Sequence, residues 1–389
     1  MHYARPAMPA DAFTLPAKHY IDDGYFRDEL ERVFLGGWFW AGRADQIPEP
    51  GDYRLVTIAD ESLILVRDRD GRVHCHYNVC RHRGTRLCEA AQGRFAETIS
   101  CPYHAWTYRL DGGLAGAPHM DDTAGFRKEE YPLRGVAVAD WDGHLWLNLH
   151  PSPPPLSEQL GSSPDKFQAW GMRELRLGHR IVYDVRANWK LILQNYSECL
   201  HCPINHPALK RYAHYLSGDN ETPEGDPNDF GGSMDLYDGV ETMSSTGKRR
   251  RLLGSLNASQ ERKVYFYVVM PNLLLTLHPD YMMTHALWPQ APDRTQIVCD
   301  WHYHPDDLAQ PGFDPQNEVA FWDQTNREDW RLSELTQQGL RSRAYVPGPY
   351  SCREDLLLAL DRWILNRMSA GAPGRIPAAD EPINGNGGR

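Results

Sequence analysis

Two short motifs between residues 80 and 104 constrain the fold of this chain more than any other feature. The first reads Cys80-Arg-His82, and after eighteen further residues the second reads Cys101-Pro-Tyr-His104. Each motif offers one thiolate and one imidazole, and Pro102 stiffens the second turn. Two sulfur and two nitrogen donors suit zinc or an iron–sulfur centre. The sequence therefore predicts two tight loops that meet around a metal.

The order of the donors separates the two kinds of metal site. Zinc ribbons usually pair like with like, as Cys-x-x-Cys and His-x₃₋₅-His. Here each loop starts with a cysteine and ends with a histidine. That order gives two cysteines to one iron and two histidines to the other, which is the ligand set of a Rieske [2Fe–2S] cluster. A zinc ribbon remains the alternative.

The surroundings of these motifs resemble the Rieske domain of the Rieske non-haem iron oxygenases. The similarity rests on C-R-H-R-G from Cys80, C-P-Y-H-x-W-x-Y from Cys101 and the following L-D-G, within residues of about 38–118. The resemblance implies that Cys80, His82, Cys101 and His104 hold the cluster. Cys75 and Cys88 lie outside the motifs and are expected to be ordinary thiols.

A second group of donors follows about a hundred residues later. Glu198 and His201 are three residues apart and share a helix face. His206 comes five residues after His201, and Pro203 should end the helix near residue 200, so that His206 can swing back. Two histidines and one carboxylate form the facial triad of mononuclear Fe(II) oxygenases. Asn195 is expected to donate hydrogen bonds to the ligands.

The family that this chain resembles has E/D-x-x-H-x₄-H at this point, which Glu198, His201 and His206 match. Its metal-binding carboxylate lies later, in an Asp five residues before a Glu followed by Gln and Gly. Asp329 fits that pattern; Asp323 and Glu328 are the alternatives. A zinc site that uses Cys199, Cys202 and a histidine is also conceivable.

The resemblance further implies how electrons reach the iron. The cluster of one subunit would face the mononuclear iron of its neighbour in a head-to-tail homotrimer, and Glu198 would bridge His104 of one subunit to His201 of the next. A separate flavin/iron–sulfur reductase would supply electrons from NAD(P)H, because the chain has no G-x-G-x-x-G fingerprint. O₂ would be the cosubstrate.

Charge and composition exclude several other classes. The formal net charge is −11, so a nucleic-acid-binding surface is not expected. The sequence has no apolar run of about 18 residues and no signal-peptide pattern, which favours a cytoplasmic protein with no membrane segment. In that compartment the eight cysteines are expected to be thiols or metal ligands rather than disulfides.

The turn signals and hydrophobic patterns predict an α+β protein with two parts. Residues 38–150 should form a small all-β Rieske domain, and residues 151–165 a Pro-rich linker. Residues 1–37 and 166–368 should form a larger helix-grip-like domain, an antiparallel sheet with helices, that holds the mononuclear iron. The tail, residues 369–389, should be disordered. Within the larger domain we predict strands over 175–185, 263–270, 273–278, 281–288 and 297–304, helices over 187–200, 315–338 and 353–368, and a long polar loop over 217–262.

Two features suggest a substrate. The stretches Glu198–Pro207 and Leu277–Tyr281 resemble the branch of the family that demethylates or oxidises betaines and other quaternary ammonium compounds. The strands between 263 and 288 also carry four aromatic residues that could form a cation–π box: Tyr265, Tyr267, Tyr281 and Trp288. The hypothesis is N-demethylation of a small onium substrate, or its hydroxylation next to nitrogen. The alternatives are an aromatic-ring hydroxylating oxygenase or dioxygenase, a Rieske electron carrier without oxygenase activity, and a zinc-stabilised binding module.

Overall fold

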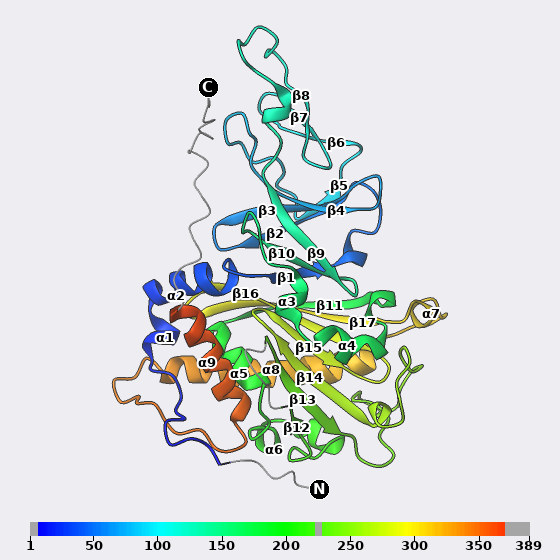
Figure 1. Cartoon of the computed structure of the whole chain (residues 1–389). Helices are drawn as coiled ribbons and strands as arrows, with labels where there is room; N and C mark the ends of the chain where they lie inside the picture. The colour runs from blue at the N-terminus through cyan, green and yellow to red at the C-terminus, as the bar shows by residue number, and fades with distance from the viewer. Residues whose placement is uncertain (1–6, 222–227, 370–389) are drawn as a thin grey trace.

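The computed structural model describes residues 7–221 and 228–369, which are built around two seven-stranded antiparallel sheets (Figure 1). In the first sheet the order is β1-β10-β9-β4-β3-β2-β5. Its strands are β1 (Phe39–Arg43), β2 (Asp52–Ile58), β3 (Glu61–Arg67), β4 (Val73–Tyr77), β5 (Gln92–Arg94), β9 (Gly135–Trp141) and β10 (His144–Asn148). A three-stranded sheet of β6 (Thr98–Ser100), β7 (Thr107–Arg109) and β8 (Leu114–Gly116) projects from it at the top of Figure 1.

The second sheet has the order β11-β17-β16-β15-β14-β13-β12. Its strands are β11 (Arg176–Val185), β12 (Asp219–Asn220), β13 (Asp229–Asp235), β14 (Lys263–Val269), β15 (Leu273–Leu277), β16 (Met282–Ala291) and β17 (Arg294–Tyr303). Helices α5 (Trp189–Tyr196) and α8 (Gln316–Gly339) lie on the side of this sheet away from the first sheet (Figure 1). The remaining helices are α1 (Lys18–Ile21), α2 (Asp23–Glu29), α3 (Leu156–Leu160), α4 (Ser163–Phe167), α6 (Cys202–Asn205), α7 (Pro305–Leu308) and α9 (Asp355–Ser369). The α+β class predicted from the sequence is confirmed.

One large hydrophobic core runs through both seven-stranded sheets. It includes Trp146 in the first sheet and Trp301 in the second, both fully buried. A smaller core lies beneath the Cys/His motifs and contains Ile64, Trp106 and Tyr108. The two ends of the molecule are therefore joined by continuous packing, whereas the motif loops rest on a core of their own.

Two connecting segments differ from the sequence-based predictions. The Pro-rich linker predicted over 151–165 contains α3 and the start of α4. Leu156 and Leu160, one helical turn apart in α3, are both buried. The polar loop predicted over 217–262 contains strands β12 and β13. The pattern of β13 was hidden by Gly231 and Gly232, where a Cβ atom would collide with neighbouring backbone. These glycines let neighbouring strands approach closely.

The helix predicted over 187–200 ends earlier, at Tyr196. Ser197 Oγ donates a hydrogen bond back to the carbonyl of Leu193 at 2.7 Å, and the chain then leaves the helix. Pro203 does not end this helix as predicted. It lies in the first turn of α6, where a missing N–H costs nothing.

The helix predicted over 353–368 is α9, which ends at Ser369. The rest of the tail that was predicted to be disordered, residues 370–389, lies outside the described residues. None of the helices in the described ranges is long and apolar enough to cross a membrane.

A buried ion pair attaches α5 to the N-terminal segment. Glu29, at the end of α2, accepts hydrogen bonds from Lys190 Nζ at 2.6 and 2.8 Å and from Trp189 Nε1 at 3.0 Å. Both charged side chains are fully buried. Because α5 leads directly into Glu198 and His201, this pair fixes the start of the segment that carries the site residues.

Replacing Glu29 with Gln should destabilise the fold. The substitution leaves the Lys190 ammonium buried without a countercharge, and breaking such a pair costs about 3–5 kcal/mol. Urea unfolding followed by circular dichroism should show a lower midpoint for Glu29→Gln. The control Glu31→Gln changes an exposed residue of the same charge and should stay within about 0.5 kcal/mol of wild type. Equal midpoints for the two variants would contradict this role.

Candidate metal sites

The two Cys/His loops have the same backbone design. The Gly84 N–H donates to the Cys80 carbonyl at 3.0 Å, and the Ala105 N–H donates to the Cys101 carbonyl at 3.1 Å. Both closing residues have positive φ, +74° at Gly84 and +57° at Ala105. The N–H of each cysteine also bonds to a carbonyl five residues later, at 2.8 Å in both loops. Each loop therefore presents its cysteine and histidine from one tight turn.

The donor groups of the two loops face one another. Cys80 and Cys101 are buried, and the rings of His82 and His104 have centroids 4.7 Å apart. His82 Nδ1 is buried and has no hydrogen-bond partner among the described residues, so a metal is a fitting partner for it. Tyr108 places its hydroxyl 3.3 Å from Cys80 Sγ. Two thiols and two imidazoles fit the ligand set of a Rieske cluster.

Burial affects the cysteine chemistry at this site. Desolvation raises the pKa of the Cys80 thiol, whereas the hydrogen bond from Tyr108 opposes that shift. A raised pKa favours the protonated thiol of Cys80. Binding of iron would release its proton, because thiolate is the form that binds metals.

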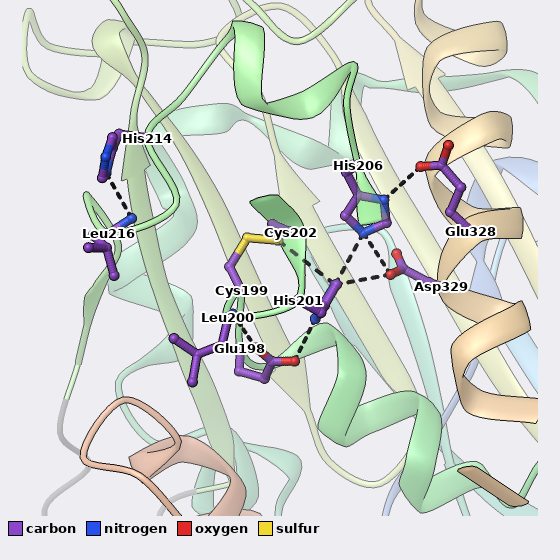
Figure 2. The surroundings of a disulfide bond; sticks show 10 residues. All are labelled: Glu198, Cys199, Leu200, His201, Cys202, His206, His214, Leu216, Glu328 and Asp329. Carbon is purple, nitrogen blue, oxygen red and sulfur yellow. Dashed lines mark hydrogen bonds and ion pairs between the residues drawn. A yellow bond between two sulfur atoms is a disulfide. The ribbon is translucent and has the colours of Figure 1, made fainter. Parts of the chain in front are cut away.

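The second group of donors lies between α5, α6 and α8 (Figure 2). His201 Nε2 and His206 Nε2 are 3.1 Å apart, and Asp329 Oδ1 lies 3.2 Å from the first and 2.8 Å from the second. Ligands at about 2.1 Å from one ion and at right angles to each other are about 3 Å apart. The three atoms therefore have the spacing of one face of an octahedral site, and the residues present fit a mononuclear iron.

Carboxylates on the outer side hold both imidazoles. Glu198 Oε1 lies 2.5 Å from His201 Nδ1, and Glu328 Oε2 lies 2.7 Å from His206 Nδ1. A carboxylate at Nδ1 fixes the proton there and leaves the Nε2 lone pair for a metal. Glu328 was considered only as a ligand in the sequence analysis. Its carboxylate reaches His206 from helix α8, which is distant in the sequence. No local sequence pattern could have indicated this contact.

The three carboxylates weighed as the third ligand have different places. Asp329 faces the two Nε2 atoms, and Glu328 lies on the far side of His206 (Figure 2). Asp323 accepts hydrogen bonds from Tyr183 at 2.8 Å and from Arg327 at 3.0 Å instead. Asp329 is therefore the carboxylate that converges with the histidines.

Contacts among the histidines and carboxylates of this group shift their pKa values. Burial lowers the pKa of His201, but the hydrogen bonds to Asp329 and Glu198 outweigh it and raise the pKa to about 10. For Asp329, burial raises the pKa, whereas contacts with His201 and His206 lower it to below its usual value. A metal ion would replace the protons held here, so metal binding should release them.

A cavity of about 120 Å³ opens beside these donors and includes Asn195 and Glu198 in its wall. Six aromatic residues also line it: Tyr196, Tyr215, Phe230, Phe266, Trp322 and Trp330. No hydrogen bond within the described ranges joins the Asn195 amide to the histidines. His285, which sequence reasoning missed, lies in the wall with both ring nitrogens unpartnered among the described residues, and burial lowers its pKa to about 4.

The four aromatic residues proposed as a cation–π box are not among those that line the cavity. Tyr265 and Tyr267 flank Phe266 in β14, and neighbouring residues of a strand point to opposite faces. Tyr281 is fully buried, and its hydroxyl donates to the Met243 carbonyl. Trp288 is also buried, away from the cavity wall. Tyr265 and Tyr267 therefore face away from the cavity, whereas Tyr281 accepts a hydrogen bond from Trp322 of the cavity wall at 2.7 Å without lining the cavity itself.

The cysteines of this segment correct another prediction. Cys199 and Cys202 form a disulfide, although all eight cysteines were expected to be thiols or metal ligands (Figure 2). The turn between α5 and α6 brings their Cα atoms to 5.0 Å, within the range that a disulfide spans. The six other cysteines are free. In the disulfide form neither sulfur is available for the alternative zinc site.

Together, the paired loops and the two-histidine, one-carboxylate group define an oxidoreductase class, and the chain belongs to the Rieske non-haem iron oxygenases. Residues 172–370 match the catalytic domain of the ring hydroxylating alpha subunit, and residues 37–131 match the Rieske [2Fe-2S] domain. The family holds a Rieske cluster and a mononuclear iron. Neither an electron carrier nor a zinc-stabilised binding module is expected to have this catalytic domain.

Named relatives are monooxygenase oxygenase subunits. The glycine betaine monooxygenase oxygenase subunit of Chromohalobacter salexigens is 31% identical over 396 residues, covering 92% of this chain and 88% of that protein. The carnitine monooxygenase oxygenase subunit of Escherichia coli is 29% identical and covers 87% of both chains. The quaternary ammonium Rieske monooxygenase CntA, solved with its substrate L-carnitine, has the same fold, with a TM-score of 0.77, 24% identity and coverage of 93% of this chain and 99% of that chain.

Removing Asp329 should empty only one of the two metal sites. We expect about three irons and about two acid-labile sulfides per wild-type chain, and about two of each in Asp329→Ala, because the cluster does not use Asp329. Iron and sulfide assays on purified protein measure this. Asp323→Ala is the matched control on the same helix and should keep the third iron. Three irons in Asp329→Ala would show that another residue completes the site.

Proposed function

We propose that this chain is the oxygenase component of a quaternary ammonium monooxygenase. It would use O₂, and electrons from NAD(P)H delivered by a separate flavin/iron–sulfur reductase, to N-demethylate or hydroxylate a small betaine-like substrate. The observation that carries this proposal is the aromatic-lined cavity whose wall contains His201, His206 and Asp329. The relatives named for glycine betaine and carnitine support the same substrate class.

Each donor residue has a defined task in this proposal. When bound, the cluster at Cys80, His82, Cys101 and His104 supplies single electrons, and the iron at His201, His206 and Asp329 activates O₂. Glu198 and Glu328 keep the Nδ1 protons of the two histidines, so that both Nε2 atoms remain donors. His201, His206 and Asp329 would hold the iron through three protein donors, next to the cavity that would take the substrate.

The cavity offers complementary groups for both ends of a betaine. Phe266 and Trp322 lie edge to face with ring centroids 6.2 Å apart, and aromatic faces attract a quaternary ammonium group. Arg353 is the only lysine or arginine among the described residues that line the cavity. Its guanidinium has no ion-pair partner within the described ranges, so it is available to a substrate carboxylate.

Turnover tests should separate the substrate classes. With a reductase and NADH, we expect O₂ uptake and formaldehyde release from glycine betaine or carnitine, and none from simple arenes. Turnover of arenes only would instead support the ring-hydroxylating alternative, since an aromatic-lined cavity also accepts an arene.

Arg353→Ala should raise the KM for a carboxylated substrate by about 10–100-fold, the worth of a hydrogen bond to a charged group. It should change the KM for choline little, because choline has no carboxylate. Steady-state kinetics with both substrates measures this contrast. Arg343→Ala, at an exposed arginine outside the cavity wall, is the control and should leave both values unchanged.

The positions of the two sites favour electron transfer between subunits. Within one chain the Cys/His loops lie near the top of Figure 1, by β6 and β7, whereas α5, α6 and α8 lie in its lower half. Exposed apolar side chains flank both sites: Val79 and Tyr103 at the loops, and Leu200 and Ile204 at the histidine segment. We propose that these surfaces meet in a head-to-tail homotrimer, in which Glu198 bridges His201 to His104 of the next subunit.

Substitutions at this contact test the assembly. Ile204, which is 91% exposed, should be part of the contact, so Ile204→Glu should yield monomers in light-scattering measurements. Val346→Glu is the matched control at another exposed apolar residue and should leave the assembly intact.

Glu198→Ala should keep the third iron but abolish reoxidation of the reduced cluster by O₂ and substrate. A monomeric wild type with full activity would refute the trimer.

A further inference from the structure

The disulfide between Cys199 and Cys202 is not used by the proposed reaction, although it lies within the iron-binding segment. Both residues line the cavity. Cys202 follows His201 directly in the sequence, and Cys199 precedes it by two residues. Figure 2 shows the sulfur bridge beside the convergent imidazoles. A redox-active group at this distance from a metal site can change the donors that the metal meets.

The sulfur of Cys202 lies close enough to act as a donor. Its Sγ atom is 3.8 Å from His201 Nε2. The sulfur and one nitrogen each from His201 and His206 all lie within 4.8 Å of one another. In a tetrahedral zinc site, with bonds of about 2.0–2.1 Å to nitrogen and about 2.3 Å to sulfur, the nitrogen–sulfur separation is about 3.6 Å. Cys202 therefore needs only a small movement to bind the same ion.

The bond to Cys199 is what withholds this sulfur. A disulfide sulfur has no charge and is a poor ligand, whereas a thiolate binds zinc strongly. Cys202 is buried on the metal side, at 5% exposure, whereas Cys199 is partly exposed. A reductant can therefore reach Cys199, and the thiol released on the inner side is that of Cys202.

We propose that reduction of the Cys199–Cys202 disulfide creates a second metal-binding state, in which Cys202 joins His201, His206 and Asp329 as a fourth protein donor. Reduction by a phosphine uses one water: the phosphine becomes its oxide, and the two sulfurs take the two electrons and the two protons as thiols. The Cys202 thiol then gives up its proton to the solvent when it binds a divalent ion.

This state would have a different metal preference. Four protein donors that include a soft thiolate favour tetrahedral zinc and leave no open position, in contrast with the open facial triad. The inference rests on the proposed metal site but not on the proposed substrate. The disulfide thereby withholds the donor that favours zinc over iron, and its reduction would lower activity by favouring exchange of iron for zinc.

X-ray absorption at the zinc edge tests this directly, because the iron cluster does not contribute. The full chain, with its cluster in place and its mononuclear site loaded with zinc, is measured before and after treatment with tris(2-carboxyethyl)phosphine, which adds no sulfur ligand. We expect zinc–sulfur scattering at about 2.3 Å only after reduction. Thiol titration of the denatured protein should rise by about two per chain, since one disulfide gives two thiols.

Variants make the assignment specific. Cys199→Ser should show zinc–sulfur scattering without any reductant, because Cys202 is then free. Cys202→Ser should show none in either condition and should bind zinc at least about tenfold more weakly than the reduced wild type, the effect of losing one donor. Cys352→Ser, at an exposed free cysteine, should behave as wild type. The cluster spectrum verifies that each variant is folded.

Two results would overturn the inference. One is imidazole scattering without sulfur in both reduced wild type and Cys199→Ser; the site would then bind metal as proposed, but without Cys202. The other is a thiol count that does not rise on reduction. Absence of betaine turnover in the untreated, iron-loaded enzyme, together with zinc–sulfur scattering after reduction of the zinc-loaded protein, would count against the proposed function alone.

Discussion

The site depends on two hydrogen bonds behind the metal-facing atoms. An imidazole binds a metal through one nitrogen only if the proton is on the other, and the carboxylates of Glu198 and Glu328 fix it there. Without them, His201 and His206 could adopt either tautomer. The two Nε2 atoms, which lie 3.1 Å apart, would then not both be lone-pair donors. Glu198 lies in the turn after α5 and Glu328 lies in α8, so the fold determines which nitrogen of each histidine is the donor.

The rest of the larger domain holds these elements in place. Helix α8 spans 24 residues against the sheet and carries Glu328 and Asp329 as neighbours, one behind His206 and one in front of it. On the other side, the buried Glu29–Lys190 pair anchors α5. The short turn after α5 then needs only a few residues to place both histidines. The long helix α8 and the buried ion pair therefore determine the geometry of the short segment that follows α5.

Local patterns predicted the parts of the protein that local chemistry determines. The order of Cys80, His82, Cys101 and His104 indicated the cluster site, and the α+β class followed from turn signals and periodicity. Tertiary contacts decided the rest. Whether Phe266 or its neighbours face the cavity depends on which side of β14 is covered, and a strand pattern cannot tell one face from the other when both are apolar. Likewise, the early end of α5 made the Cys199–Cys202 bridge possible.

The two Cys/His loops close with the same hydrogen bonds and with a residue of positive φ at the same step, Gly84 or Ala105, yet their histidines occupy different positions in the turn. Each loop is thus a copy of one backbone unit with its imidazole moved by a single position. An engineer could treat them as interchangeable cassettes, because each supplies one cysteine and one histidine and only the place of the histidine within the turn differs between them.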